Sequence, residues 1–197
     1  MTARRWLVVL GVVAAGVAVV LVVVLPGGST SPSSYKLLDR IPAGYSLSSN
    51  GALTSSTAAR STIAASGGAA TSLEENHFTG GRARTWLNNG DVIEAAAFGF
   101  KEAAGARAFV KFQLDYAVSL AGSGATARSA VLFPIRDKPS ATGFYAAGQP
   151  LAGTNLFVTG CWFTRGDTAY LVETASPTPQ SAGLLLTLCA DQDKLAS

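Results

Sequence analysis

Two similar stretches decide the fold of this chain: RTWLNNGDVIEAAAF at 84–98 and GCWFTRGDTAYLVET at 160–174. When they are aligned without a gap, the matching residues are Trp86, Gly90 and Asp91 in the first stretch and Trp162, Gly166 and Asp167 in the second. In each stretch the glycine lies in a short polar segment, with segments rich in apolar residues before and after it. A helical pattern follows each stretch. The sequence therefore predicts two β-hairpins, each followed by a helix, as a duplicated ββα unit.

The turns of these hairpins determine which residues share a face of the sheet. Asn89-Gly90 is a preferred dipeptide for a two-residue type I′ turn, and Arg165-Gly166 occupies the equivalent place. With both turns there, the more apolar face is expected to carry Leu87, Val92, Phe98, Phe100, Phe157, Cys161, Phe163, Tyr170 and Val172. The opposite face is expected to carry Arg82, Arg84, Trp86, Ile93, Ala95, Ala97, Gly160, Trp162, Ala169, Leu171 and Glu173. One more residue in either turn would invert the assignment for that hairpin.

The two cysteines of the chain are Cys161 and Cys189. In an oxidising compartment a disulfide is the default, and closing a loop of this length stabilises a fold by about 3–4 kcal/mol. The alternatives are a reactive thiol and a metal site, but two cysteines and one histidine that are not clustered make a poor ligand set, so no metal is expected. Cys189 falls in a helix predicted over 179–195. The disulfide would therefore place the helices on the face that carries Cys161.

The remaining pattern completes an α+β domain. Apolar residues at helical spacing predict a helix over 102–120, and a shorter helix is expected over 53–65 with Thr54 or Ser55 as its N-cap. Residues 126–135 predict a further strand, and prolines interrupt the connection that follows it. The expected fold is an antiparallel sheet of about five strands or more, built from the two ββα units with helices packed on it.

The run Trp6–Leu25 contains only Trp, Leu, Val, Ala and Gly. A bilayer core of about 30 Å needs roughly 20 apolar residues in a helix, so this run predicts a transmembrane anchor. Arg4-Arg5 precede it, which favours a cytoplasmic N-terminus. Residues 1–5 would then be a cytoplasmic stub, 26–34 a flexible Gly/Ser/Pro linker and 35–197 a single extracytoplasmic domain. The alternative is a cleaved signal peptide, whose apolar run is usually only about 7–15 residues long.

The distribution of charged residues and the spacing of small residues indicate which partners the chain could bind. Residues 26–197 carry 13 basic and 12 acidic residues, and the basic ones are scattered without forming a run, so no nucleic acid is expected. The predicted anchor makes the membrane the first partner. Gly11 with Ala15, and Ala14 with Ala18, have the small-residue spacing that can seat a second transmembrane helix. A weak homodimer through this segment is a further expectation.

The stretch FGFKEAAGARAFVKF at 98–112 joins a strand to an AxxAxxF helical pattern. In this respect the chain resembles small membrane-anchored or lipid-modified envelope proteins of actinobacteria, some of which have a PsbP-like α/β/α domain. The resemblance implies a binding or accessory factor without catalytic residues, and no functional residue is carried over from it. The chain departs from the lipid-modified members because no cysteine lies near the predicted anchor.

Few residues suggest catalysis. His77 is the only histidine, and it lies beside Glu74, Glu75 and Asn76, which would allow a general base oriented by a carboxylate. No activated nucleophile can be named as its partner, and the sequence has no phosphate loop, HExxH, CxxC or dinucleotide motif. Asp91 and Asp167 are expected to flank hairpin turns. We therefore expect no enzyme and no cofactor, with a small envelope hydrolase or transferase that uses His77 as the alternative.

The candidate binding residues lie on the less apolar face. Trp86 and Trp162 would form a shallow groove there, with Arg82 and Arg84 at its edge. Such a groove would suit an anionic or amphipathic ligand or a partner protein. The competing interpretation is that further helices cover this face and make both tryptophans part of the core.

These observations together predict an extracytoplasmic binding or accessory domain with a single membrane anchor, which acts by non-catalytic contact in the cell envelope. Besides the hydrolase or transferase, the second alternative to this binding domain is a purely structural assembly factor. An open groove beside the tryptophans would favour binding, and a closed sheet without one would favour assembly.

Overall fold

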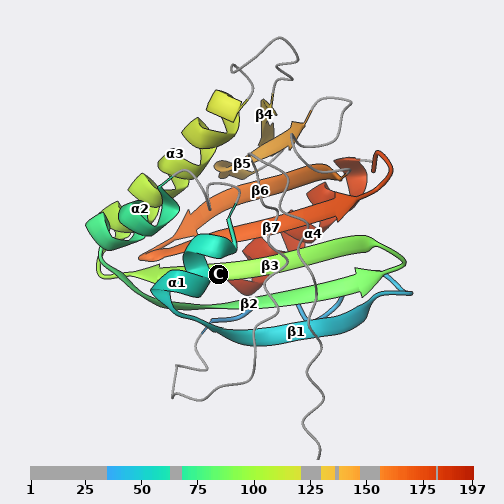
Figure 1. The fold of residues 1–197 in the computed structure, drawn as a ribbon, viewed down its shortest axis with the longest axis horizontal. Coiled ribbons are helices and arrows are strands. Elements are labelled where there is room, and N and C mark those ends of the chain that lie inside the picture. The colour runs from blue at the N-terminus through green and yellow to red at the C-terminus, as the bar shows by residue number, and fades with distance from the viewer. Residues whose placement is uncertain (1–34, 63–67, 121–129, 136–137, 147–155, 181) are drawn as a thin grey trace, which may run out of the picture.

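The computed structural model describes residues 35–62, 68–120, 130–135, 138–146, 156–180 and 182–197 (Figure 1). The predicted cytoplasmic stub, transmembrane anchor Trp6–Leu25 and linker lie outside these residues. Within the described part of the chain, no helix has the length and apolar character needed to span a bilayer.

The described elements are seven strands and four helices. In chain order they are β1 (Ser46–Leu53), α1 (Ser55–Arg60), α2 (Ala69–Glu75), β2 (Phe78–Asn88), β3 (Asp91–Phe100), α3 (Ala103–Leu120), β4 (Ala130–Ile135), β5 (Lys138–Ala146), β6 (Phe157–Arg165), β7 (Thr168–Ser176) and α4 (Ala182–Leu195). The described strands form one seven-stranded sheet in the order β1-β2-β3-β7-β6-β5-β4, and every neighbouring pair is antiparallel. The α+β class and the antiparallel sheet with helices packed on it are confirmed.

Local sequence explains several of these elements. Thr54 caps α1 in a capping box with Thr57, as the N-cap pattern predicts. The predicted strand before Ile135 is present as β4, whereas β1 and β5 were not predicted. β5 tolerates Pro139 because this proline lies at the second residue of the strand, ahead of the run that pairs with β6.

The two hairpin turns differ by one residue. The first is the predicted type I′ turn, in which Asn88 pairs with Asp91 and both Asn89 (φ 46°) and Gly90 (φ 94°) have positive φ. In the second hairpin Arg165 pairs with Thr168, so the turn residues are Gly166 and Asp167. Only Gly166 has positive φ (57°) there, which is the pattern of a type II′ turn. The turn predicted at Arg165-Gly166 therefore lies one residue later.

This shift makes the predicted face assignment wrong. Two residues separate Trp86 from its turn and three separate Trp162 from the other, and side chains alternate between faces along a strand. In the register of β3 with β7, Ala95 pairs with Val172 and Ala97 with Tyr170. Arg82, Arg84 and Trp86 thus share a face with Cys161 and Phe163, while Trp162 lies on the other face with Phe98.

Helices cover both faces of the sheet, and we name the faces after them. The α3 face is covered by α1, α2 and α3, which gather at the end of the sheet where β3 finishes, and the α4 face is covered by α4 (Figure 1). The expectation that all helices share the face of Cys161 is correct for α4 and wrong for α3. The helices that follow the two hairpins therefore lie on opposite sides of the sheet, and the prediction of a duplicated ββα unit with both tryptophans on one face is wrong.

Each face has its own core. On the α3 face the rings of Phe98, Phe109 and Trp162 have centroids 5.4–5.8 Å apart. On the α4 face Phe163 stacks on Tyr170 at 5.1 Å, beside leucines of α4. Such offset and edge-on ring contacts stabilise a core beyond their buried area.

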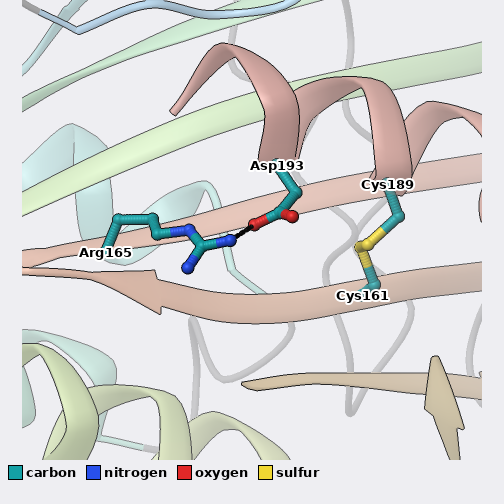
Figure 2. The surroundings of a disulfide bond; sticks show 4 residues. All are labelled: Cys161, Arg165, Cys189 and Asp193. Atoms are coloured by element: carbon teal, nitrogen blue, oxygen red, sulfur yellow. Dashed lines mark hydrogen bonds and ion pairs between the residues drawn. A yellow bond between two sulfur atoms is a disulfide. The ribbon is translucent and has the colours of Figure 1, made fainter. Parts of the chain in front are cut away.

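Two cross-links join α4 to β6, as Figure 2 shows. The predicted disulfide is confirmed, because Cys161 is bonded to Cys189 with their Cα atoms 6.5 Å apart. Four residues further along each element, the Arg165 guanidinium is paired with the buried Asp193 carboxylate. A side chain returns to the same side after four residues in a strand and after about one turn in a helix. Arg165 and Asp193 therefore meet on the same side as Cys161 and Cys189.

The segment before β1 covers the α4 face next to these cross-links. Leu37 and Leu38 are buried in the core of that face together with Trp86. The Gln192 side chain of α4 donates to the Lys36 carbonyl and accepts from the Leu38 amide, both at 2.9 Å. The segment that follows the predicted linker is therefore an integral part of the core.

Candidate functional site

The predicted groove between Trp86 and Trp162 is not formed. Trp86 is 4% exposed in the core of the α4 face, and Trp162 is 1% exposed in the core of the α3 face. The competing interpretation, in which helices cover the tryptophans and make them core residues, is the one that the structure supports. The physical cause is the one-residue shift of the second turn, which inverts one hairpin relative to the other.

Arg82 and Arg84 make contacts within the domain. Both Nε atoms donate to the Asn50 side-chain oxygen, at 2.9 and 3.4 Å, and the Arg84 Nη1 atom donates to the carbonyls of Leu37 and Leu38 at 3.0 and 2.7 Å. Burial and the neighbouring Arg82 charge lower the pKa of Arg84. Arg84 thus fastens the segment before β1 to β2, and an anion-binding role for the two arginines stays a prediction.

A pair of carboxyl groups lies on the α3 face. Glu94 of β3 and Glu173 of β7 are direct cross-strand partners, and we call them the carboxyl pair. Residues directly opposite in an antiparallel sheet have Cβ atoms about 4.5–5.5 Å apart, so these side chains are neighbours. Burial, together with the Glu173 charge, raises the pKa of Glu94 to about 8. Burial raises the pKa of Glu173 to about 7.

Hydroxyl groups extend this site across the sheet. Ser49, Thr85, Glu94 and Glu173 are successive cross-strand partners on β1, β2, β3 and β7, so all four side chains project from the α3 face. A hydrogen bond from Thr85 lowers the pKa of Glu94, which partly offsets the effect of burial. Among the described residues, the Ser49 hydroxyl and the Glu94 Oε1 atom are buried without a hydrogen-bond partner.

The surroundings of the carboxyl pair are apolar. Its neighbours on the same face are Val92 and Ala96 on β3, Leu171 and Ala175 on β7, and Val158 and Trp162 on β6. Gly160, the β6 partner of Glu173, places no side chain between Val158 and Trp162. The Trp162 indole N–H is a buried donor with no partner in the described part of the chain. Buried polar groups are usually satisfied, so unsatisfied groups next to two carboxyls indicate a place for a ligand.

No basic side chain faces the pair from the described strands. On the α3 face of β2, β3, β6 and β7 as described, the pair supplies the ionisable side chains, and no lysine, arginine or histidine joins it. Two like acidic groups side by side, without a cation, disfavour double ionisation. The pair is therefore an acidic site that holds protons instead of a counter-ion near neutral pH.

His77 lies far from the carboxyl pair. It is exposed in the turn after α2 with φ 56°, and its carbonyl accepts from the Lys101 amide. The next residue, Phe78, pairs with Phe100, whereas Glu94 lies six residues earlier on β3, a separation of roughly 20 Å. Asp91 accepts a hydrogen bond from Ser176 at 2.6 Å beside its turn. The described residues contain no group of three side chains able to hold a metal.

Sequence reasoning missed the carboxyl pair, although a signal for it exists. Glu94 interrupts the apolar run VIEAAAF, and Glu173 interrupts AYLVETA. An ionisable residue inside a strand that is otherwise apolar on both faces indicates a candidate functional position, because burying a lone charge is costly. That the two residues are partners could not be read from the sequence, since this depends on the β3–β7 register.

No family model matches the chain, and no curated protein matches it. Among solved structures, the extracellular domain of PknH from Mycobacterium tuberculosis is similar with a TM-score of 0.43 and 12% identity, over 63% of this chain and 69% of that one. A likeness at this level assigns no function.

Proposed function

We propose that this chain is a membrane-anchored extracytoplasmic domain that binds a ligand or partner by non-catalytic contact, and that the carboxyl pair on the α3 face is the point of contact. The observation that carries the proposal is the carboxyl pair itself, an acidic site among apolar side chains that no cation faces from the described strands, with unsatisfied polar atoms beside it. Burying the two carboxyls without partners lowers the stability of the domain, and a ligand that forms hydrogen bonds with them offsets this loss.

Two separate features support the proposed extracytoplasmic location. The Cys161–Cys189 disulfide is typical of oxidising compartments outside the cytoplasm. The apolar run Trp6–Leu25 with Arg4-Arg5 before it supplies the anchor and the orientation. Both features point to the same side of the membrane for residues 35–197.

Binding is favoured over hydrolysis by the electrostatics of the pair. Carboxyl-based hydrolysis needs one protonated and one ionised group, set apart by their environments. Here burial raises the pKa of both groups in the same direction, to about 8 and about 7, so their environments do not set one apart as a fixed acid and the other as a fixed base. His77, the other candidate base, lies too far along β2 to join them.

Topology can be tested by labelling single introduced cysteines with a membrane-impermeant maleimide on intact cells. Ser34→Cys should react from outside, whereas the matched variant Thr2→Cys should react only after lysis. Reaction of Thr2→Cys alone on intact cells, or a mature protein that lacks residues before Ser29, would contradict the anchored topology.

The site can be tested by photo-cross-linking in native membranes. A photoreactive residue at Leu87, which lies on the α3 face and is partly exposed, should form an adduct that Glu94→Gln with Glu173→Gln removes. The matched control is Leu47, which is 55% exposed and pairs with Trp86 on the α4 face. Adducts at Leu47 but not at Leu87, or adducts at Leu87 that persist without the carboxyls, would overturn the assignment of the site.

A further inference from the structure

We infer that the carboxyl pair receives a basic nitrogen of its ligand, an alkylammonium or guanidinium group on an apolar stem, and that binding releases a proton from Glu94 or Glu173 to solvent. This inference rests on the proposed binding function and names the class of ligand. It follows from the cross-strand pairing of the two carboxyls, from the absence of a facing cation on the described strands, and from the apolar surroundings.

The carboxyl pair matches the donors of an ammonium group. An ammonium has three donors, and the directly opposite carboxyls of Glu94 and Glu173 offer acceptor oxygens from two adjacent strands. The Glu94 Oε1 atom is buried and has no partner among the described residues. Ser49 lies two strands from Glu94, about 10 Å away, and is beyond the reach of the same nitrogen.

Charged groups on the neighbouring elements do not neutralise the pair. On α3, Arg107 is exposed and the exposed Lys111 is paired with Asp115 at 2.5 Å. On α1, the Arg60 side chain donates to the Ser56 carbonyl. The facing residues of β2 and β6 are Thr85 and Gly160, which carry no charge. Among the described residues no cation compensates the pair, and a cation supplied by a ligand would do so.

The exchange on binding involves protons only. The empty pair holds at least one proton near neutral pH, because burial raises the pKa of both carboxyls. When the ammonium enters, it donates hydrogen bonds to the carboxylate oxygens, and the displaced proton leaves to solvent. No covalent bond of the ligand forms or breaks. Since one proton is released for each ligand bound, affinity should rise up to about tenfold per pH unit below the pKa of the pair.

The apolar side chains beside the carboxyl pair are the reason for expecting an apolar stem on the ligand. Val92 and Leu87 are partly exposed on the same face towards the first turn, and Leu156 is partly buried near the start of β6. A short alkyl chain attached to the cation would cover part of this surface, which adds to the binding free energy at about 25 cal/mol for each Å² removed from water. A small inorganic cation would gain nothing from these side chains.

The test is isothermal titration of the full chain in lipid nanodiscs with n-butylammonium, and n-butanol is the uncharged control probe. Empty nanodiscs provide the blank. Titrations at about pH 6 and about pH 7, in buffers of different ionisation enthalpy, report the protons released, while the amine stays protonated throughout. Glu94→Gln, Glu173→Gln and the double variant are compared with Glu102→Gln, which alters an exposed carboxylate at the start of α3.

We expect butylammonium to bind several-fold more tightly at the higher pH, with close to one proton released. The double Gln variant should lose at least about tenfold in affinity, as expected when an ion pair is removed, while Glu102→Gln should bind like the parent. Equal binding of butanol, unchanged affinity of the double variant, no proton release, or no binding of butylammonium would each overturn the inference. If the Leu87 adduct still depends on the carboxyl pair while butylammonium fails to bind, the proposed function stands and the ligand class is wrong.

Discussion

Glu94 and Glu173 occupy positions at which the rest of β3 and β7 carry small or apolar side chains. Each carboxyl alone would be costly to bury in this sheet, and placing two of them opposite each other adds repulsion between their charges. The protein tolerates them because the pair keeps at least one proton near neutral pH, since the pKa is about 8 for Glu94 and about 7 for Glu173. At the residue scale, these two groups should control how stability depends on pH.

The free energy of unfolding should fall as pH rises from about 5 to about 8. Both carboxyls have a pKa of 4.5 when unperturbed and about 8 or about 7 in the fold, so the folded chain binds more protons in this window and loses stability as they leave. Urea denaturation at several pH values measures the slope, which Glu94→Gln with Glu173→Gln should reduce by about one to two protons. An unchanged slope in this variant would contradict the pKa values, and Glu102→Gln serves as the control.

Gly166 is a second residue whose conformation can be tested. Its φ of 57° at the first position of the second turn is unfavourable for a β-branched residue. Gly166→Val should destabilise the domain by about 1–3 kcal/mol, measured by urea denaturation. Asp167→Asn at the next turn position should be nearly neutral, because Asp167 is not among the residues with positive φ. A tolerated valine would mean that the turn lies elsewhere.

At the scale of elements, α4 is held to β6 by two cross-links on one side of the helix. The Cys161–Cys189 disulfide lies one helical turn from the pair formed by Arg165 and the buried Asp193. α3 is held differently, by the packing of Phe109 between Phe98 and Trp162. The two helices that follow the hairpins thus pack by different means on opposite faces.

Replacing both Cys161 and Cys189 by alanine should cost about 2–5 kcal/mol of unfolding free energy. The loss comes from a less constrained unfolded chain, while the Arg165–Asp193 pair keeps α4 in register in the folded one. Thermal denaturation checks the stability, and an intact mass two hydrogens lighter than the reduced form checks the bridge in the parent. Two free thiols in protein taken from membranes would contradict both the disulfide and the proposed compartment.

At the scale of the whole molecule, the beginning and the end of the domain are joined. Gln192 near the C-terminus bonds Lys36 and Leu38, and Arg84 in the middle of the chain bonds the carbonyls of the same segment. The predicted anchor is thus followed by residues that are built into the α4 face. The α3 face, with the carboxyl pair, lies on the opposite side of the sheet from this attachment.

Gln192→Leu should destabilise the domain by about 1–3 kcal/mol, because it leaves the buried Leu38 amide and the Lys36 carbonyl without their partners. The segment also covers Trp86, so its release should shift tryptophan emission to longer wavelength before global unfolding. Thr187→Val on the exposed side of α4 is a matched control with little expected effect. Unchanged stability of Gln192→Leu would show that the segment is not fastened by this residue.

Local features of this protein were predictable from its amino-acid sequence. The turn at Asn89-Gly90 was predictable because a type I′ turn needs positive φ at two residues, and the cap at Thr54 because its hydroxyl binds a nearby amide. The helices over 103–120 and 182–195 and the Cys161–Cys189 bridge were also predictable, since periodicity and cysteine count are properties of the chain alone.

Only the tertiary structure decided which residues face one another. Gly166 can take either central position of a two-residue turn, and the one it takes sends Trp86 and Trp162 to opposite faces. The partnership of Glu94 with Glu173 likewise depends on the pairing of strands that lie far apart in the chain. Side chains alternate with a period of two, so a one-residue difference in register, which local sequence barely distinguishes, inverts a whole face and moves the candidate site with it.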